Sequence, residues 1–480
     1  MAAGLLAAST AWSAPVVDVL IEAARPGALI HEELYGQTLA SGGAGQPGAL
    51  WVGPDSTLPN IRGWRQDLVE ALQRLHVPVL RWPAGCQADN YHWRDGVGAR
   101  AQRPLRRLPD GGAVDDNSVG THEFFDLAEL AGSSAYISAN VGTGSAREAA
   151  EWAEYLEADG GSTLGQLRVQ NGHPQPFEAR FVGVGQAPWG CGGNMSAQYY
   201  ADLYNQFAVF IRGKSTQPPT LVASGNGPAW TAELSKKKRV RDYRFLIGAH
   251  DDAQDKDGEG AADGGWMSAL RQAARLDTFI ASNIAQLDKN DPAHKLPLVI
   301  SGWNTRTNAA QPQSLRDALA AALQLHVLHA HADRVSMASF SAPLNSPQAM
   351  ILADGARLTL TPTYHAFRMH APFQGATALP VRLDHTPNYT VGQLSAPALS
   401  VSAARAKDGK LYVSLVNADP AHPQEAAVQF AGASPSKASA SVLGADASQA
   451  EPMSVPVRIA RGQLRITLPA KSLTVVAVDE

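Results

Sequence analysis

The stretch FVGVGQAPWGCGGN, residues 181–194, joins a short apolar segment to a glycine-rich loop. Residues 181–185 fit a buried strand, and the glycines after Trp189 allow the backbone of the loop to come close to a ligand. The centre of the loop reads Gln186, Ala187 and Pro188. Because an alanine side chain neither donates a proton nor attacks a substrate, the segment has the form of an active-site loop without its acid.

The same alternation of helix and strand recurs along the chain. We expect helices at residues 64–75, 121–130, 147–156, 196–211, 266–287 and 315–329. We expect strands at residues 77–82, 135–141, 181–185, 220–224, 296–301 and 334–341. Short buried strands that alternate with amphipathic helices indicate parallel βα units. Their span and number favour a (β/α)8 TIM-type barrel, an α/β fold, over a doubly wound parallel sheet.

The pattern changes after Gly375, where helical periodicity stops. Short strands separated by turn residues follow, at residues 399–403, 410–417, 425–429, 438–443, 463–468 and 473–478. They predict a jelly-roll-like β-sandwich over residues 376–480, after a barrel over residues 31–375. A strand predicted at residues 16–22, within the segment 14–30, is expected to join the sandwich.

Charge and hydropathy exclude several classes of function. The formal net charge is −4 and the pI is about 6.4, so the chain has no global field suited to nucleic acid or to an anionic membrane. No later stretch approaches the roughly 18 apolar residues of a membrane span. Residues 1–13 are small and apolar but lack a basic start, which we interpret as a truncated signal segment. The expected location is periplasmic or secreted, with the cytoplasm as the alternative.

Neither the cysteines nor the charge runs predict a metal or cofactor site. Cys86 and Cys191 have no metal-ligand spacing, and we expect them to stay unpaired unless their two loops meet at one rim. The basic run 236–239 has no interleaved aromatic residues, which indicates a solvated loop. The acidic run 251–259 fails the EF-hand register and is interpreted as an exposed loop. We therefore expect no metal and no cofactor.

The carboxyl ends of the predicted strands are where a barrel of this type keeps its chemistry. They carry a polar and aromatic set without Asp or Glu: Arg81, Trp82, Asn140, Gln186, Ala187, Ser224, Asn226, Ser301, Gly302, Trp303 and Asn304. This set suits a polyol ligand, because side-chain amides hydrogen-bond to hydroxyl groups and aromatic rings pack on the apolar faces of sugars. A single tryptophan at a barrel rim, however, more often serves packing. Sugar hydrolysis, however, requires two carboxylates at such a rim.

Five segments together resemble glycoside hydrolase family 51, the retaining α-L-arabinofuranosidases. They are WVGPDSTLPNI at residues 51–61, RWPAGCQADNYHWRDGVG at 81–98, WGCGGNMSAQYYAD at 189–202, the segment 315–335, and QAMILADGARLTLTPTY at 348–364. The resemblance implies a barrel with a jelly-roll domain, cleavage of terminal arabinofuranosyl groups from plant polysaccharides, no cofactor and frequent homo-oligomers.

The resemblance also assigns the missing carboxylates. The family's Gly-Asn-Glu-x-Trp-Gly-Cys-Gly-Gly motif places its acid/base glutamate at Ala187, and its Asp-Glu-Trp-Gly motif places the nucleophile at Gly302. A third, substrate-contacting glutamate aligns with Ala40. No catalytic residue is therefore intact. The substrate-binding positions implied by the family are Arg81, Gln186, Trp189, Trp303, Gln348 and, only with a slip of register, His250.

Three hypotheses follow for the function. The first is a catalytically silent or strongly impaired homologue that still binds an arabinofuranosyl-containing glycan. The second is an active arabinofuranosidase that uses relocated carboxylates, and the third is an assembly or interaction scaffold without a carbohydrate ligand. The acids nearest to the lost positions, which we expect to be structural or solvated, are Asp89, Glu123, Asp202, Asp251, Asp252 and Asp317.

Overall fold

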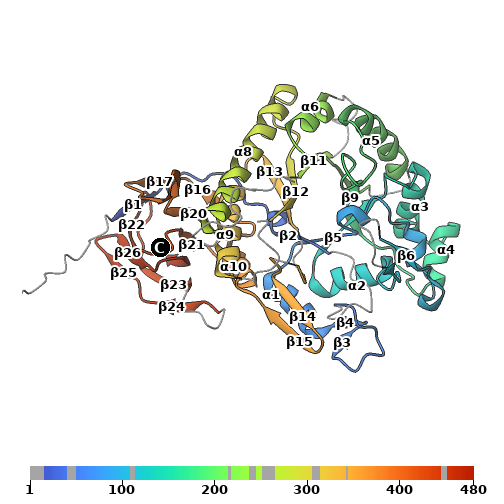
Figure 1. Ribbon diagram of the computed structural model, residues 1–480, viewed down its shortest axis with the longest axis horizontal. Coiled ribbons are helices and arrows are strands. Elements are labelled where there is room, and N and C mark those ends of the chain that lie inside the picture. The colour runs from blue at the N-terminus through green and yellow to red at the C-terminus, as the bar shows by residue number, and fades with distance from the viewer. Residues whose placement is uncertain are drawn as a thin grey trace, which may run out of the picture.

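A computed structural model of the 480-residue chain contains a closed barrel of eight parallel strands (Figure 1). The structure describes residues 16–39, 50–108, 114–213, 218–236, 245–250, 265–304, 314–341, 344–346, 348–444 and 451–480. Around the barrel the strands run in the order β10 (Thr220–Ala223), β11 (Phe245–His250), β12 (Leu298–Trp303), β13 (Val335–Phe340), β2 (Gly36–Thr38), β5 (Val79–Trp82), β8 (Ser134–Ala139) and β9 (Ala179–Val184). The predicted (β/α)8 barrel is confirmed.

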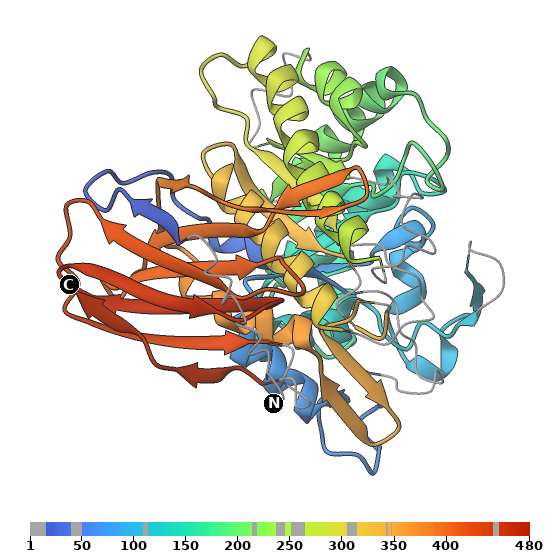
Figure 2. The ribbon, with the colours of Figure 1, turned by 60° about the vertical axis from the view of Figure 1, so that its left-hand side comes forward.

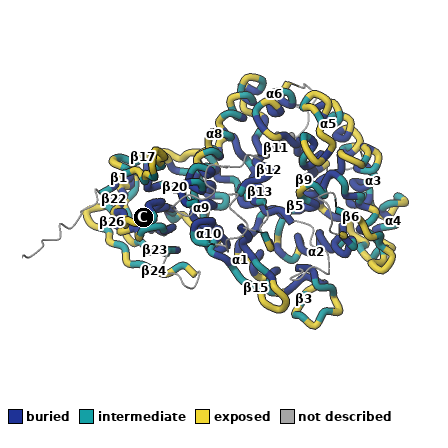
Figure 3. The backbone as a smooth tube through the Cα atoms, in the orientation of Figure 1, coloured by how far each residue is buried: buried dark blue, intermediate teal, exposed yellow. Residues whose placement is uncertain are grey.

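Helices cover the outside of the barrel, as the ring around the strands in Figure 1 shows. They are α1 (Gln66–Leu75), α2 (Thr121–Ala131), α3 (Ala146–Glu157), α4 (Thr163–Gln170), α5 (Ala197–Arg212), α6 (Pro228–Lys236), α8 (Trp266–Asn290), α9 (Leu315–Ala330) and α10 (Pro362–His370). In Figure 3 the strands at the centre are buried, and the exposed backbone lies mainly on the outer helices and loops. Within the described ranges, no helix is both long and apolar enough to span a membrane.

The barrel interior is built in two layers of side chains. The lower layer is one apolar cluster formed by Val79, Tyr136, Phe181, Val222, Val299 and Met337. Successive side chains of a strand point to opposite faces, so the residues two positions further along point inward again. Along β5, β8, β9, β10 and β13 this upper layer consists of Arg81, Ser138, Gly183, Ser224 and Ser339, whereas a register shift between Ile300 and Trp303 interrupts the alternation in β12. The interior therefore changes from apolar to polar toward the carboxyl ends of the strands.

Two barrel strands are absent from the strand set predicted by sequence periodicity. β2 has only three residues, Gly-Gln-Thr, and no apolar alternation. Its pairing with β13 and β5 closes the sheet, so the closure of the barrel and not local propensity defines it. β11 was not among the strands expected from periodicity, although His250 at its end is one of the binding positions implied by the family resemblance.

Two further sheets pack face to face beside the barrel, on the left of Figure 1 and in the foreground of Figure 2. One contains β16 (Thr377–Leu379), β20 (Leu399–Arg405), β21 (Leu411–Asn417), β27 (Ser472–Asp479), β23 (Lys437–Leu443) and β24 (Met453–Val455). The other contains β17 (Val381–Asp384), β1 (Val17–Ile21), β22 (Gln424–Phe430), β26 (Gln463–Leu468) and β25 (Arg458–Ala460). β1 thus brings the amino-terminal part of the chain into the carboxyl-terminal domain, parallel to β22 and antiparallel to β17.

Short hairpins complete the fold. They pair β3 (Asn60–Ile61) with β4 (Trp64–Arg65), β6 (Arg106–Arg107) with β7 (Val114–Asp115), β14 (Ile351–Asp354) with β15 (Arg357–Leu360), and β18 (Asn388–Val391) with β19 (Leu394–Pro397).

Three buried histidines hold the two domains together. His326 and His329 of α9 bond to serine hydroxyls of the sandwich: His326 to Ser400 at 2.9 Å and to Ser414 at 2.8 Å, and His329 to Ser402 at 2.9 Å. His370, at the end of α10, also contacts the Ser414 hydroxyl at 2.9 Å. Burial lowers the pKa of all three imidazoles, that of His370 to about 4.

This cluster predicts that the protein loses stability in acid. In the unfolded chain these histidines titrate near 6.5, whereas in the folded chain the pKa is depressed. The unfolded state therefore takes up protons first, so the stabilisation is present above about pH 6.5 and is lost progressively as the pH falls toward 4. For His370 alone the loss at about pH 5 is roughly 2 kcal/mol. Urea unfolding at about pH 7.5 and pH 5 measures it.

The matched control for this prediction is an exposed histidine. His294 has a side chain that is 56% exposed, so His294→Gln should leave the slope of unfolding free energy against pH unchanged, while His370→Gln should flatten it. Equal slopes in the wild-type chain and in His370→Gln would contradict the assignment.

Candidate active site

Arg81 stands at the centre of the upper barrel layer. Its side chain is fully buried, and its guanidinium lies over the Tyr136 ring, 4.6 Å from the ring centroid. Nε donates to the Ser138 hydroxyl at 3.0 Å, and Nη1 donates to the Ser301 carbonyl at 3.1 Å. Nη2 has no hydrogen-bond partner. Arg81 thus links β5, β8 and β12 across the barrel through neutral acceptors.

The glycine-rich loop after β9 is fixed by a second buried charge, the Asp89 carboxylate. The amide of Gln186 donates to both oxygens at 3.1 Å, and the amide of Ala187 donates to Oδ2 at 2.7 Å. A Cβ at Gly192 would collide with the same carboxylate, so the loop passes Asp89 at a distance that only glycine permits. Burial raises the Asp89 pKa, and the backbone N–H groups oppose that shift.

A disulfide also joins this loop to the loop after β5. Cys86 and Cys191 are bonded, with their Cα atoms 5.5 Å apart and a sequence separation of 105 residues. The expectation of two unpaired cysteines is therefore wrong. The reason is geometric: the carboxyl ends of parallel strands meet at one rim of a barrel, so two loops that are distant in sequence become neighbours.

The two positions assigned to the catalytic glutamates lie on this rim. Ala187 follows β9, and its carbonyl accepts from the amides of Gly190 and Gly192 at 3.0 and 2.9 Å, which defines a tight turn. Gly302 lies in β12, directly after the Ser301 carbonyl that Arg81 contacts. Ala40, the third position, lies outside the described residues, as do residues 1–13, 237–239 and 251–259.

The remaining predicted binding residues have different surroundings. Gln186 and Gln348 are buried side chains, and His250 pairs with Gly302 in the β11–β12 ladder. Trp303 is buried against Phe340 and Phe367, with ring centroids 5.0 and 5.8 Å away.

Trp189 is partly buried, and its ring lies 5.7 Å from that of Trp230. Both tryptophans thus have protein packing partners that account for their positions.

Nearby acids with described side chains all have structural partners or face solvent. Asp89 binds the loop backbone, as described above. Glu123 is buried with Arg103 at 3.1 Å and caps α2 at Gly120. Asp317 is buried and caps α9 by accepting from the Ser314 amide at 3.1 Å. Asp202 is exposed on α5. Asp251 and Asp252 are outside the described residues.

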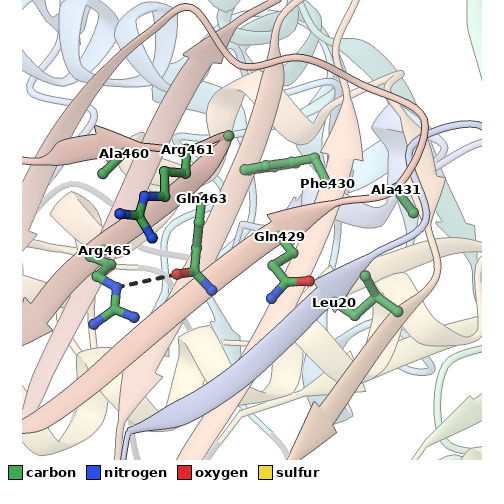
Figure 4. Close-up of a pocket in the computed structure, with 9 residues that line it drawn as sticks. Leu20, Gln429, Phe430, Ala431, Ala460, Arg461, Gln463 and Arg465 are labelled. Atoms are coloured by element: carbon green, nitrogen blue, oxygen red, sulfur yellow. Dashed lines mark hydrogen bonds between the residues drawn. The ribbon is translucent and has the colours of Figure 1, made fainter.

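Two cavities elsewhere in the described structure lack a pair of free carboxylates facing a polar pocket. A cavity of about 650 Å³ on the sandwich has no Asp or Glu in its lining; Figure 4 shows the residues that line it, namely Leu20, Gln429, Phe430, Ala431, Ala460, Arg461, Gly462, Gln463 and Arg465. A second, of about 570 Å³, lies at the amino ends of β8 and β9. Of the acids that line it, Asp126 and Glu129 both pair with Arg62, and Glu178 is exposed to solvent. Among the described residues, no group of three or more potential ligands is placed to hold a metal ion.

Sequence reasoning missed Tyr136, Ser138 and Tyr200, which build the site together with Ser224, one of the expected strand-end residues. Tyr136 and Ser138 contact Arg81, and the Ser224 hydroxyl donates to the Gly185 carbonyl at 2.8 Å, which ties β10 to the loop after β9. The Tyr200 hydroxyl of α5 accepts from the Ser224 amide at 2.7 Å. Counting two positions on from each apolar barrel residue would have found Ser138, but no local signal points to Tyr200.

Comparison with known proteins places both parts of the chain in one family. Residues 71–251 match the family described as Alpha-L-arabinofuranosidase 1 domain, and residues 293–475 match the Alpha-L-arabinofuranosidase C-terminal domain. An intracellular exo-α-L-arabinofuranosidase of Bacteroides ovatus is 34% identical over 98% of this chain and 97% of its own length.

Solved structures agree with this match. The family 51 arabinofuranosidase from Xanthomonas axonopodis pv. citri is 36% identical, with a TM-score of 0.90 over 97% of this chain and 100% of that one. The α-L-arabinofuranosidase from Thermotoga maritima, solved as an arabinose complex, is 25% identical, with a TM-score of 0.84 over 97% of this chain and 100% of that one.

Replacing Asp89 by asparagine is predicted to release the loop. The amide group of the introduced side chain would turn an N–H donor toward backbone N–H groups that now donate to a carboxylate, so Asp89→Asn should cost roughly 1–3 kcal/mol of unfolding free energy. Hydrogen exchange of residues 185–193 should accelerate. Asp55→Asn, at an exposed loop position, is the matched control and should change neither quantity. Unchanged exchange in Asp89→Asn would refute the role.

Removing the disulfide is predicted to destabilise the fold. A cross-link that closes a long loop restricts the unfolded chain, so the double variant Cys86→Ser/Cys191→Ser should lose roughly 2–5 kcal/mol of unfolding free energy. Dithiothreitol should lower the Tm of the wild-type chain to that of the variant and leave the variant unaffected. A wild-type Tm that does not respond to the reductant would contradict the prediction.

Proposed function

The chain belongs to the α-L-arabinofuranosidases of glycoside hydrolase family 51, and from this we propose that it is a member in which hydrolysis is lost or strongly impaired while the barrel mouth still binds an arabinofuranosyl-containing glycan. The observation that carries the proposal is Gly302. This position, assigned to the nucleophile, follows the carbonyl that Arg81 contacts, and it has no side chain.

The loss affects both halves of the reaction. A retaining glycosidase needs an acid for the leaving oxygen and a nucleophile about 5–5.5 Å away from it. Ala187 provides no proton, and Gly302 provides no nucleophile. General acid catalysis alone contributes typically 10²–10⁴-fold, and without a nucleophile the covalent route is closed as well. Helix-capping and solvated acids such as Asp317 and Asp202 do not replace these groups.

Retained glycan binding is supported by the frame around the missing carboxylates. Asp89 and the disulfide hold the loop after β9 in place. The buried side-chain amides of Gln186 and Gln348 are groups that can hydrogen-bond to sugar hydroxyls. Arg81, Trp189, Trp303 and His250 complete the proposed set. Calorimetric titration with arabino-oligosaccharides tests this proposal. We expect saturable binding to the wild-type chain and weaker binding to Gln348→Ala. If the wild-type chain shows no binding, the scaffold hypothesis is favoured.

A second candidate, hydrolysis by relocated carboxylates, is favoured by one observation. His250 pairs with Gly302, and the next two residues in the chain are Asp251 and Asp252. Turnover of an aryl arabinofuranoside by the wild-type chain that disappears in Asp251→Asn or Asp252→Asn would support this candidate over the silent homologue.

The disulfide also bears on location. Disulfides persist in oxidising compartments, so the Cys86–Cys191 bond supports a periplasmic or secreted protein. Fractionation of cells that express the full chain, with the thiols of each fraction titrated, tests this proposal. A fully reduced protein in the cytoplasm is the contrary result.

Restoring the two carboxylates is predicted to restore hydrolysis. The variant Ala187→Glu/Gly302→Glu should hydrolyse 4-nitrophenyl α-L-arabinofuranoside at least about 10²-fold faster than the wild-type chain, because it regains an acid and a nucleophile. Gly302→Glu alone should regain part of this rate, since nitrophenolate leaves without an acid. Full recovery is not expected, because Gln186, Pro188 and Ala40 remain changed.

The control for the restoration is the uncharged pair Ala187→Gln/Gly302→Gln, which fills the same space without a carboxylate. If this variant is as fast as the glutamate pair, or if the wild-type chain already matches it, carboxylate loss does not limit the reaction.

A further inference from the structure

The barrel interior contains a buried cation that lacks an acceptor. Arg81 is fully buried, and an arginine side chain stays protonated in proteins. Two of its nitrogens donate to neutral oxygens, the Ser138 hydroxyl and the Ser301 carbonyl, while Nη2 donates to nothing. Within the described part of the chain, Arg81 forms no ion pair. A buried charge in this state is costly unless a further group compensates it.

The neighbouring charged and titratable groups that the structure describes do not supply that compensation. The face of the Tyr136 ring lies beneath the guanidinium, but its attraction for a cation is weak compared with that of a carboxylate. The positive charge of Arg81 lowers the pKa of Asp89, so the two charged groups interact electrostatically. Both Asp89 oxygens, however, already accept amides of Gln186 and Ala187.

The unpaired groups show what kind of partner is missing. Arg81 Nη2, the Tyr136 hydroxyl and the Ser339 hydroxyl are all buried in the barrel interior without a hydrogen-bond partner, and each can donate. The missing group is therefore an acceptor. A water molecule would accept a hydrogen bond but leave the charge unbalanced, whereas a carboxylate offers two oxygens and a negative charge.

Gly302 is the position for such a group, because it directly follows Ser301, whose carbonyl Arg81 contacts, and because glycine has no side chain of its own. We propose that the barrel beside Arg81 and Gly302 binds the carboxylate of an external ligand, either a small organic acid or a sugar acid, in place of a carboxylate of its own. The inference rests on the proposed loss of the nucleophile, and it changes the ligand class from a neutral sugar to an anion.

Thermal unfolding of the full chain, followed during titration with matched pairs of ligands, tests the proposal. Formate is compared with formamide, and glucuronate with glucose, at a constant ionic strength set by sodium chloride. We expect the Tm to rise and saturate with the carboxylates but not with the neutral partners, because a ligand that binds only the folded state stabilises it. A response to glucuronate alone identifies a sugar acid, and a response to formate alone identifies a small acid.

Two variants test where the anion binds. Gly302→Glu supplies an internal carboxylate to Arg81, so it should weaken formate or glucuronate binding at least about tenfold. Without ligand its Tm should exceed that of the uncharged Gly302→Gln by about 2 °C or more, because only glutamate balances the charge. Absence of a saturable carboxylate effect in the wild-type chain, equal binding by Gly302→Glu, or a Tm of Gly302→Gln that equals or exceeds that of Gly302→Glu would each overturn the proposal.

The result is separable from the proposed function. A wild-type chain that hydrolyses arabinofuranosides yet is stabilised by carboxylates refutes catalytic silence and keeps the anion site. A silent chain that ignores carboxylates refutes the anion site alone.

Discussion

The buried guanidinium of Arg81 is the interaction around which the upper barrel layer is arranged. It connects β5 to β8 through the Ser138 hydroxyl and to β12 through the Ser301 carbonyl, and it rests on the Tyr136 ring. A full positive charge in a packed interior is tolerated only where acceptors surround it. The hydroxyl-rich layer above the apolar cluster meets part of that requirement, and Gly302 adds no side chain to it.

A second buried charge organises the rim. Asp89 holds the loop after β9 by accepting its backbone amides, and the Cys86–Cys191 bond ties the same loop to the neighbouring strand end. Neither interaction involves the side chains at Ala187 or Gly302. The shape of the rim is thus independent of the groups that would perform hydrolysis, which explains how the fold stays close to that of the Xanthomonas enzyme while the carboxylates are absent.

The sequence predicted the barrel well wherever a strand was long and apolar. β5, β8, β9, β10, β12 and β13 lie within two residues of their expected bounds, because apolar runs bounded by turn residues are a strong local signal. β2 was missed because three residues without alternation carry no such signal, and only pairing with β13 and β5 makes them a strand. The histidines of α9 and α10 gave no sign in the sequence of their role between the two domains.

By itself the sequence determined which side chains stand at Ala187 and Gly302, because no fold adds a carboxylate to alanine or glycine. The tertiary structure decided what surrounds those gaps. Whether Arg81 finds a counter-ion, whether Cys86 meets Cys191, and whether Trp303 packs against Phe340 depend on residues far apart in the chain that the barrel brings together. Electrostatic and packing interactions depend on distances between side chains in space. These contacts therefore follow from closure of the sheet and cannot be predicted from any single segment of the sequence.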